Sequence, residues 1–140
     1  MKTQKLIRVF LVMLLLGILI SCSEDQTTAP APSTNTSLSK FSEIKAKVFV
    51  NCLGAQCHSS SGNQGNLILE PDVAYNNLVG VQSVLFPQFK RVEAGNSANS
   101  LIIKILRGQV SPQMPLIGTP LPSATIDSIA KWIDQGALNN

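Results

Sequence analysis

The chain has 140 residues, which is room for one folded domain beside any targeting segment. Its formal net charge of +3 comes from 11 basic and 8 acidic side chains, but three of the basic ones (Lys2, Lys5 and Arg8) lie at the N-terminus, and eight of each sign follow Cys22. That balance leaves no basic face and excludes nucleic acid as an expected partner.

The N-terminus has the pattern of an export signal. Its apolar run, Val9–Ile20, is shorter than the roughly 20 residues that a membrane-spanning helix needs. The run ends in Leu19-Ile20-Ser21-Cys22, which resembles the lipobox of bacterial lipoproteins. We therefore expect a signal peptide over 1–21 and a lipid on Cys22. The protein would be an exported lipoprotein anchored to a membrane, on the periplasmic side or at the cell surface, with the outer membrane favoured. The alternative is an ordinary secretory signal that happens to end near a cysteine.

Residues 22–37 are expected to form a lipidated, disordered tether. From Ser23 to Ser37 the chain has no large apolar residue, so it has nothing to offset the entropy cost of folding. The folded domain is expected over 38–140.

We expect this domain to be all-α, with several short helices joined by long loops, and we find no credible strand pair. In the first helix Leu38, Phe41, Ile44 and Val48 recur at helical spacing. This helix leads the chain towards Cys52.

Three more helices follow. Asp72 is expected to cap a short helix through Leu78 that stops at Gly80. Residues 97–106 are expected to form one helix closed by Gly108.

The last helix begins at Pro122-Ser123 and stops at Gly136, with one apolar stripe made of Ile126, Ile129, Ala130 and Ile133. Trp132 and Phe49 are expected to touch where the first and last helices cross. The stretches 59–69 and 109–121 are rich in Gly, Pro and Ser and are expected to be loops that enclose a prosthetic group.

The cysteines suggest what that group is. The sequence Cys52-Leu53-Gly54-Ala55-Gln56-Cys57-His58 places an imidazole directly after the second of two thiols. Covalent attachment of a c-type haem needs this set, because the thiols add to the two vinyl groups and the next residue supplies an axial nitrogen to iron. His58 is the only histidine, and Met114 is the only methionine outside the signal, so its thioether is the expected sixth ligand.

Two alternatives use the same atoms. In an oxidising compartment Cys52 and Cys57 would otherwise form a disulfide. A metal ion would find three ligands in Cys52, Cys57 and His58, but no fourth of the usual type.

Taken together, these residues resemble a bacterial monohaem c-type cytochrome domain of the class I-like, planctomycete type found on exported proteins and lipoproteins. The resemblance covers about 41–137, and several landmarks follow one another in order: the first helix running into Cys52, Cys57 and His58; Tyr75-Asn76-Asn77-Leu78-Val79-Gly80-Val81; Arg91-Val92 before Gly95-Asn96; Met114-Pro115; and Trp132-Ile133-Asp134 before Gly136-Ala137.

The resemblance implies one haem c, with thioethers from Cys52 and Cys57, His58 as the proximal ligand of the iron and Met114 as the distal one. It leaves Arg91 either as a partner of a haem propionate or as a solvated or helix-capping residue. The chain departs from the common motif in one respect, because four residues rather than two separate the cysteines. The extra pair must bulge, and Gly54 would ease that turn.

The expected function is that of a membrane-tethered carrier of single electrons between redox partner proteins in or at the membrane, and not that of an enzyme. One alternative is a haem enzyme or sensor with a labile sixth site, although no second histidine is present to act as an acid or base beside the haem. The other is a structural surface lipoprotein in which Cys52 and Cys57 are joined.

Overall fold

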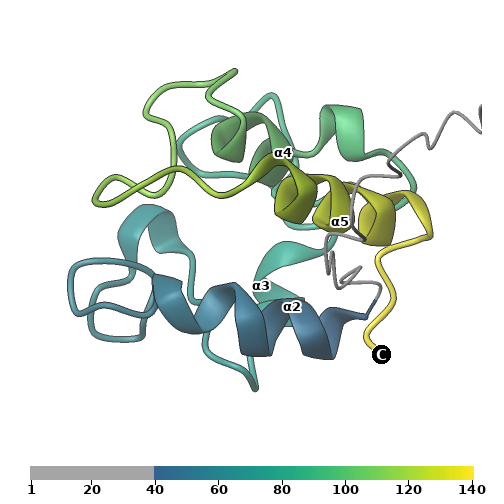
Figure 1. Ribbon diagram of the computed structural model, residues 1–140. Helices are drawn as coiled ribbons and strands as arrows, with labels where there is room; N and C mark the ends of the chain where they lie inside the picture. Colours follow the sequence, from purple (N-terminus) through teal and green to yellow (C-terminus); the bar gives the residue numbers. More distant parts are fainter. Residues whose placement is uncertain (1–39) are drawn as a thin grey trace, which may run out of the picture. The chain divides into compact units, whose positions relative to one another are not determined.

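The computed structural model describes residues 40–140 (Figure 1). The expected signal peptide over 1–21, the lipidation site Cys22, the tether and Leu38 lie outside the described residues. These assignments stay predictions.

The described part of the chain is helical and contains no strand, which confirms the all-α expectation. It has two isolated bridges, Val79 with Val92 and Gln82 with Lys90. The helices and 3-10 turns are, in order, α2 (Phe41–Lys47), η1 (Phe49–Cys52), η2 (Gln64–Asn66), α3 (Ala74–Leu78), η3 (Ser97–Asn99), α4 (Leu101–Leu106) and α5 (Ser123–Asp134). None of these helices is long and apolar enough to cross a membrane.

Helix α2 buries the stripe that its sequence predicts, with Phe41, Ile44 and Val48 all in the core. The N–H groups of its first turn lack partners within the helix. Asn140 supplies them, because its Oδ1 accepts from the Phe41 amide at 2.9 Å and its backbone oxygen from the Ser42 amide at 2.9 Å. The end of the chain is thereby held against the start of the domain.

Helix α3 exists and stops where expected, with Gly80 at a φ of 76°, but its predicted cap is wrong. The N-cap is Val73, and no side chain caps the helix. Asp72 lies one residue too early for that role.

The single helix expected over 97–106 is interrupted at Ser100, which has an extended backbone. The Ser100 hydroxyl is fully buried; it donates to the Asn96 carbonyl at 2.9 Å and accepts from the Glu93 amide at 2.8 Å. A serine that bonds to nearby backbone competes with the helix, and it splits this segment into η3 and α4.

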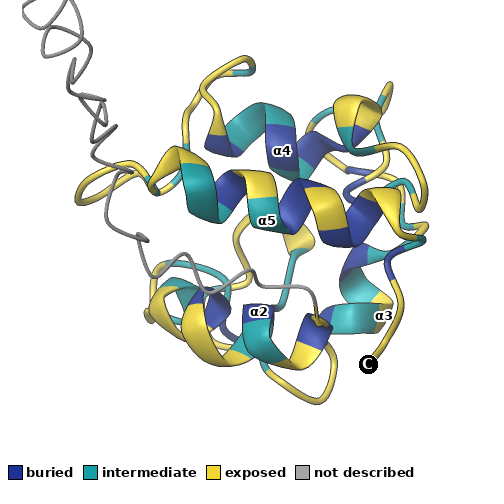
Figure 2. Ribbon diagram, turned by 45° about the vertical axis from the view of Figure 1, so that its right-hand side comes forward, coloured by how far each residue is buried: buried dark blue, intermediate teal, exposed yellow. Residues whose placement is uncertain are grey.

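Helix α5 buries its predicted apolar stripe and also Trp132 (Figure 2). The expected contact of Trp132 with Phe49 is mediated by Phe41. The Phe41 ring stacks on Trp132 at 5.1 Å between centroids and meets the edges of Phe49 at 6.1 Å and Tyr75 at 5.3 Å. This aromatic cluster joins the first and last helices.

Candidate functional site

A cavity of about 540 Å³ lies at one end of the domain. Side chains from η1, from α4, and from the loops 59–69 and 109–121 line it, and most of them are apolar. In Figure 1 the blue-teal loops after α2 and the light-green loop before α5 lie at the same end of the molecule. The volume is within the roughly 300–1,000 Å³ typical of sites that enclose an organic ligand.

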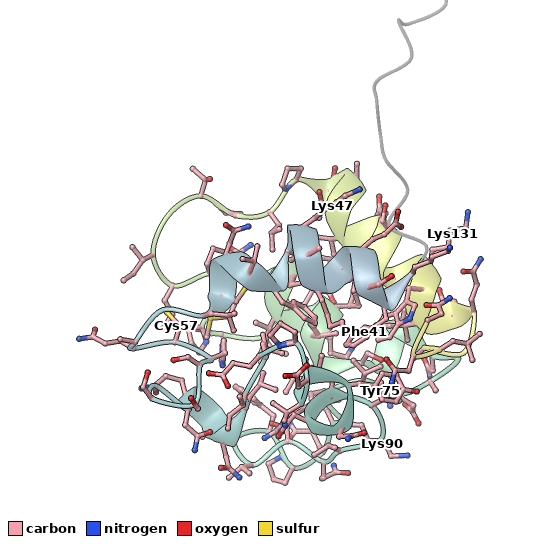
Figure 3. All side chains as sticks on the ribbon, turned by 90° about the horizontal axis from the view of Figure 1, so that it is seen from below. Phe41, Lys47, Cys57, Tyr75, Lys90 and Lys131 are labelled. Atoms are coloured by element: carbon pink, nitrogen blue, oxygen red, sulfur yellow. The ribbon has the colours of Figure 1, made fainter. Side chains whose placement is uncertain are left out.

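Three of the four residues expected to hold a prosthetic group line this cavity: Cys52, His58 and Met114. Cys57 is half-buried but is not part of the cavity wall. Figure 3 shows Cys57 beyond the C-terminal end of α2, at the opposite side of the domain from Tyr75. Both cysteines are free thiols, so the disulfide alternative is not formed in this structure.

The four-residue spacing is accommodated by two backbone bonds. The Cys57 amide donates to the Gly54 carbonyl at 2.8 Å, and the His58 amide donates to the Cys52 carbonyl at 3.0 Å. The Ser59 hydroxyl also donates to Gly54 at 3.2 Å. The extra residues therefore form a turn closed by these bonds, with Cys57 outside the cavity wall.

In this bulge glycine is required because a Cβ would lie too close to Cys57, and not because the backbone has a positive φ. Gly54 is not among the glycines with positive φ, but a Cβ there would lie 3.2 Å from the Cys57 sulfur. A Cβ on Gly62 would lie 2.6 Å from the Cys57 carbonyl oxygen and 2.7 Å from its nitrogen. Gly62 thus lets the following loop pack directly on the Cys57 peptide.

The ring of His58 is oriented by a backbone carbonyl. Its Nδ1 lies 3.2 Å from the Gln64 oxygen. A carbonyl only accepts, so Nδ1 is the donor in this contact, and in the neutral imidazole the lone pair is then on Nε2. A fixed tautomer of this kind is how proteins prepare a histidine for a metal.

The loop after His58 is held at its far end. The Leu69 amide donates to the His58 carbonyl at 2.8 Å. The Glu70 carboxylate accepts from both the amide and the hydroxyl of Ser60, each at 2.8 Å. These two bonds lower the pKa of Glu70, with the amide bond the larger cause.

Cys52 is held at the end of η1 with its thiol partly buried. Its Sγ donates to the Val48 carbonyl at 3.6 Å. Burial, and then the nearby Cys57, raise the pKa of the Cys52 thiol. Because thiol–disulfide exchange proceeds through the thiolate, this raised pKa makes Cys52 the weaker attacking group.

Met114 is positioned by the end of α4. The last carbonyls of a helix lack partners within it. In α4 the Met114 amide donates to the Ile105 carbonyl at 3.3 Å, and the Gln113 side chain donates to the Leu106 carbonyl at 3.0 Å. The loop that carries the thioether is thereby fastened to α4, which buries Leu101, Ile103 and Leu106.

Arg91 also lines the cavity; it is buried, and no carboxylate of residues 40–140 pairs with it. Its side chain is buried, with 6 % exposed, and this burial lowers its pKa. The guanidinium donates to the carbonyls of Asn77 at 2.8 Å, Gly65 at 3.1 Å and Asn66 at 2.8 Å. Arg91 therefore ties the end of α3 to the loop that orients His58.

Sequence reasoning missed part of the cavity wall. Ser83, Leu85 and Phe86 line the cavity from the segment after α3. The sequence feature that could have indicated this role is that no charged residue occurs between Val73 and Phe89. Within 40–140, no three His, Cys, Asp or Glu side chains come together as they would around a metal ion, and this includes Cys52, Cys57 and His58.

No family model matches the chain, and comparisons with the curated proteins and with the solved structures gave no match either.

Proposed function

We propose that this chain is a c-type cytochrome that carries single electrons between protein partners, with one covalently bound haem in the cavity. The observation that supports this most strongly is that Cys52, His58 and Met114, which the sequence singles out, line one apolar cavity. Met114 is far from the other two in sequence, so a shared cavity was not guaranteed by the motif.

The residues present fit such a group. The cavity offers an apolar enclosure, a histidine whose Nε2 is free, a thioether and a thiol. Cys52 and Cys57 would form the thioethers, and Cys57 would turn its side chain towards the cavity to do so. His58 and Met114 would be the two axial ligands of the iron. The group, when bound, supplies an iron that accepts and releases one electron.

The chain's own residues have three tasks in this proposal. The Gln64 carbonyl holds His58 in one tautomer. The apolar walls would limit the access of water to a bound iron, which would favour its less charged, reduced state. Arg91 brings a buried positive charge that no carboxylate balances among the described residues, and a ligand carboxylate such as a haem propionate would balance it.

The absorption spectrum of the exported protein is the test. We expect a red protein whose spectrum is that of a six-coordinate, low-spin haem, and whose haem stays on the chain in a denaturing gel because thioethers survive unfolding. Replacing both Cys52 and Cys57 with Ala should remove the bound haem from that gel. A colourless wild-type protein that folds stably would refute the proposal, and a five-coordinate spectrum would favour the enzyme or sensor.

A further inference from the structure

Arg91 is the single charged side chain that is buried among residues 40–140, with 6 % of it exposed. Its guanidinium donates to the carbonyls of Asn77 at 2.8 Å, Gly65 at 3.1 Å and Asn66 at 2.8 Å. A buried charge is costly unless its hydrogen bonds are made, and removing a partner of such a charge is strongly destabilising. The guanidinium and the three carbonyls therefore fix one another's positions.

Two of these carbonyls belong to the loop that orients His58. Gly65 and Asn66 follow Gln64 directly, and the Gln64 carbonyl lies 3.2 Å from the His58 Nδ1. Three consecutive carbonyls thus have fixed partners, the first on His58 and the next two on Arg91. Because neighbouring peptide planes share a Cα, a displacement of Gly65 or Asn66 would move the Gln64 carbonyl away from the ring.

The loop has a backbone conformation that needs support from outside it. Asn63, Gly65 and Asn66 have positive φ values of 44°, 63° and 56°. Residues other than glycine rarely adopt this left-handed region, and such a conformation persists only where the surrounding structure holds it. Bonds within the loop close its turn, from the Asn66 amide to the Asn63 carbonyl at 3.1 Å and from the Leu67 amide to the Gln64 carbonyl at 3.2 Å. Neither bond uses the carbonyl of Gly65 or Asn66.

The segment that carries Arg91 makes a second contact with this loop. A Cβ on Gly65 would lie 3.4 Å from the Leu85 Cδ1, so the Leu85 side chain lies against Gly65. The segment is closed on itself, because the Arg91 amide donates to the Val81 carbonyl at 2.8 Å. Leu85 and Arg91 therefore support the loop together.

We propose that Arg91 is a positioning residue for His58. Its bonds to Gly65 and Asn66 hold the preceding carbonyl against the imidazole, and the effect of this on a bound iron rests on the proposed function. An arginine has five N–H groups, and the carbonyls use three of them, so two remain for a ligand carboxylate and the two roles are compatible. A lysine could not substitute, because its ammonium is a point charge on a flexible stem and not a planar fork.

The proposal fixes the sign of an effect on the reduction potential. A hydrogen bond from Nδ1 makes the other ring nitrogen of His58 more basic. A more basic ligand favours the more highly charged, oxidised iron, so loosening this bond should raise the potential. Losing the positive charge of Arg91 should lower the potential, because a nearby cation favours the less charged, reduced iron.

Arg91→Lys separates the two effects, because it keeps the charge and removes the fork. In the exported, haem-loaded protein, kept reduced, we expect the Nδ1 proton of His58 to exchange with water roughly tenfold faster than in the wild type, as measured by NMR. The potential should rise, as measured by redox titration of the absorption spectrum. Arg91→Gln should exchange as fast as Arg91→Lys but have a lower potential, because it also loses the charge.

Two control variants leave the loop after His58 untouched. Arg107→Lys makes the same replacement in an exposed arginine that pairs with Asp127. Ile129→Ala removes a fully buried side chain of α5 that is not part of the cavity wall. Both should keep the wild-type exchange rate of the His58 proton and the wild-type potential.

The wild-type protein offers a measurement that needs no variant. If Arg91 holds the loop, the Nδ1 proton of His58 and the guanidinium protons of Arg91 should become exchangeable in the same local opening. Their exchange, corrected for intrinsic rates, should then depend in the same way on dilute denaturant. This comparison tests the proposal even if the Arg91 variants do not fold.

Three results would overturn the positioning role of Arg91. They are an Arg91→Lys variant with the wild-type exchange rate and potential, an Ile129→Ala variant that exchanges as fast as Arg91→Lys, and a wild type in which the His58 proton exchanges while the Arg91 protons stay protected. A colourless wild-type protein would instead refute the proposed function. The two failures are distinguishable, because the exchange measurement needs only the folded chain.

Discussion

At the scale of single residues, His58 is held more firmly than its half-exposed position suggests. Its Nδ1 bonds to the Gln64 carbonyl at 3.2 Å, and its own carbonyl accepts from Leu69 at 2.8 Å. The ring and the backbone are therefore fixed by separate partners on the same loop. If His58 binds iron as proposed, this prior ordering reduces the entropy lost on binding.

Gly62 is expected to be required for the cysteine loop. In Gly62→Ala the new Cβ would meet the Cys57 peptide at 2.6–2.7 Å, which forces the backbone to move. We expect the free energy of unfolding to fall by about 1–3 kcal/mol and less haem to be attached, as measured by denaturant unfolding and haem staining.

Gly95→Ala is the control for that variant. Gly95 has a φ of 80° with no atom near its missing Cβ, so the substitution strains the backbone without a clash. It should cost about 1–2 kcal/mol and leave haem attachment intact. If Gly62→Ala and Gly95→Ala lost equal amounts of haem, haem attachment would depend on the stability of the domain and not on the close packing of Gly62 against Cys57.

Met114→Ala tests the distal ligand. If the Met114 sulfur binds iron, the variant should lose the sulfur-to-ferric-iron charge-transfer band, have a lower reduction potential and take up added ligands. Leu116→Ala, which shortens a neighbouring side chain of the same cavity, should keep the band. The absence of the band in the wild type would assign the site to another group.

At the scale of elements, the last carbonyls of the short helices accept hydrogen bonds from residues that line the cavity. Helix α4 buries Leu101, Ile103 and Leu106, and its last carbonyls bind the loop that carries Met114. Helix α3 ends against Arg91, which bonds to the Asn77 carbonyl at 2.8 Å. Unpaired carbonyls, which every helix leaves at its C-terminus, are used here to fasten the cavity walls.

The loop after His58 is expected to loosen in acid. Bonds from Ser60 lower the pKa of Glu70 in the folded protein. The stabilisation is therefore fully present above the ordinary pKa of a glutamate and is lost as the pH falls through the lowered, folded value. The amide shift of Ser60, followed by NMR against pH, should titrate below the usual glutamate range.

Glu70→Gln is the control for this titration. It keeps an oxygen that accepts from Ser60 but removes the charge, so the Ser60 amide shift should become independent of pH in that range. A Ser60 titration that persists in Glu70→Gln would assign the effect to another group.

At the scale of the whole molecule, the segments 48–69, 73–89 and 108–126 contain no Asp, Glu, Lys or Arg, and most of the residues that line the cavity come from them. Charged residues flank these segments, because Lys90 pairs with Gln82 and Lys104 lies over the Phe89 ring. Asn140 is hydrogen-bonded to the first turn of α2, at the end of the domain opposite the cavity loops (Figure 1).

We predict that the lipid on Cys22 anchors the domain to a membrane and that the tether over 22–37 sets how far it can reach. Both lie outside the described structure. Cys22→Ala should release a soluble form or leave an unprocessed precursor, with the haem spectrum unchanged, as fractionation and absorption would show. Removing 23–37 should slow electron exchange with membrane partners and leave the potential unchanged. Equal rates with and without the tether, together with turnover of a small molecule, would favour the enzyme.

The sequence by itself determined the features that depend on local spacing. Phe41, Ile44 and Val48, and likewise the stripe on α5, are buried as their periodicity predicts. The cysteine motif predicts which residues would hold a prosthetic group, and that prediction depends only on spacing along the chain. Asp72 failed as a cap and Ser100 broke a helix, because each depended on which backbone groups lay nearby.

Only the tertiary structure decided what surrounds the candidate site. It brought Met114 to the cavity of Cys52 and His58, left Cys57 outside the wall, and added Leu85 and its neighbours as a third side. It also turned Arg91 inward to carbonyls of two distant segments. These placements follow from how loops pack against one another, and no residue pattern within a single loop carries that information.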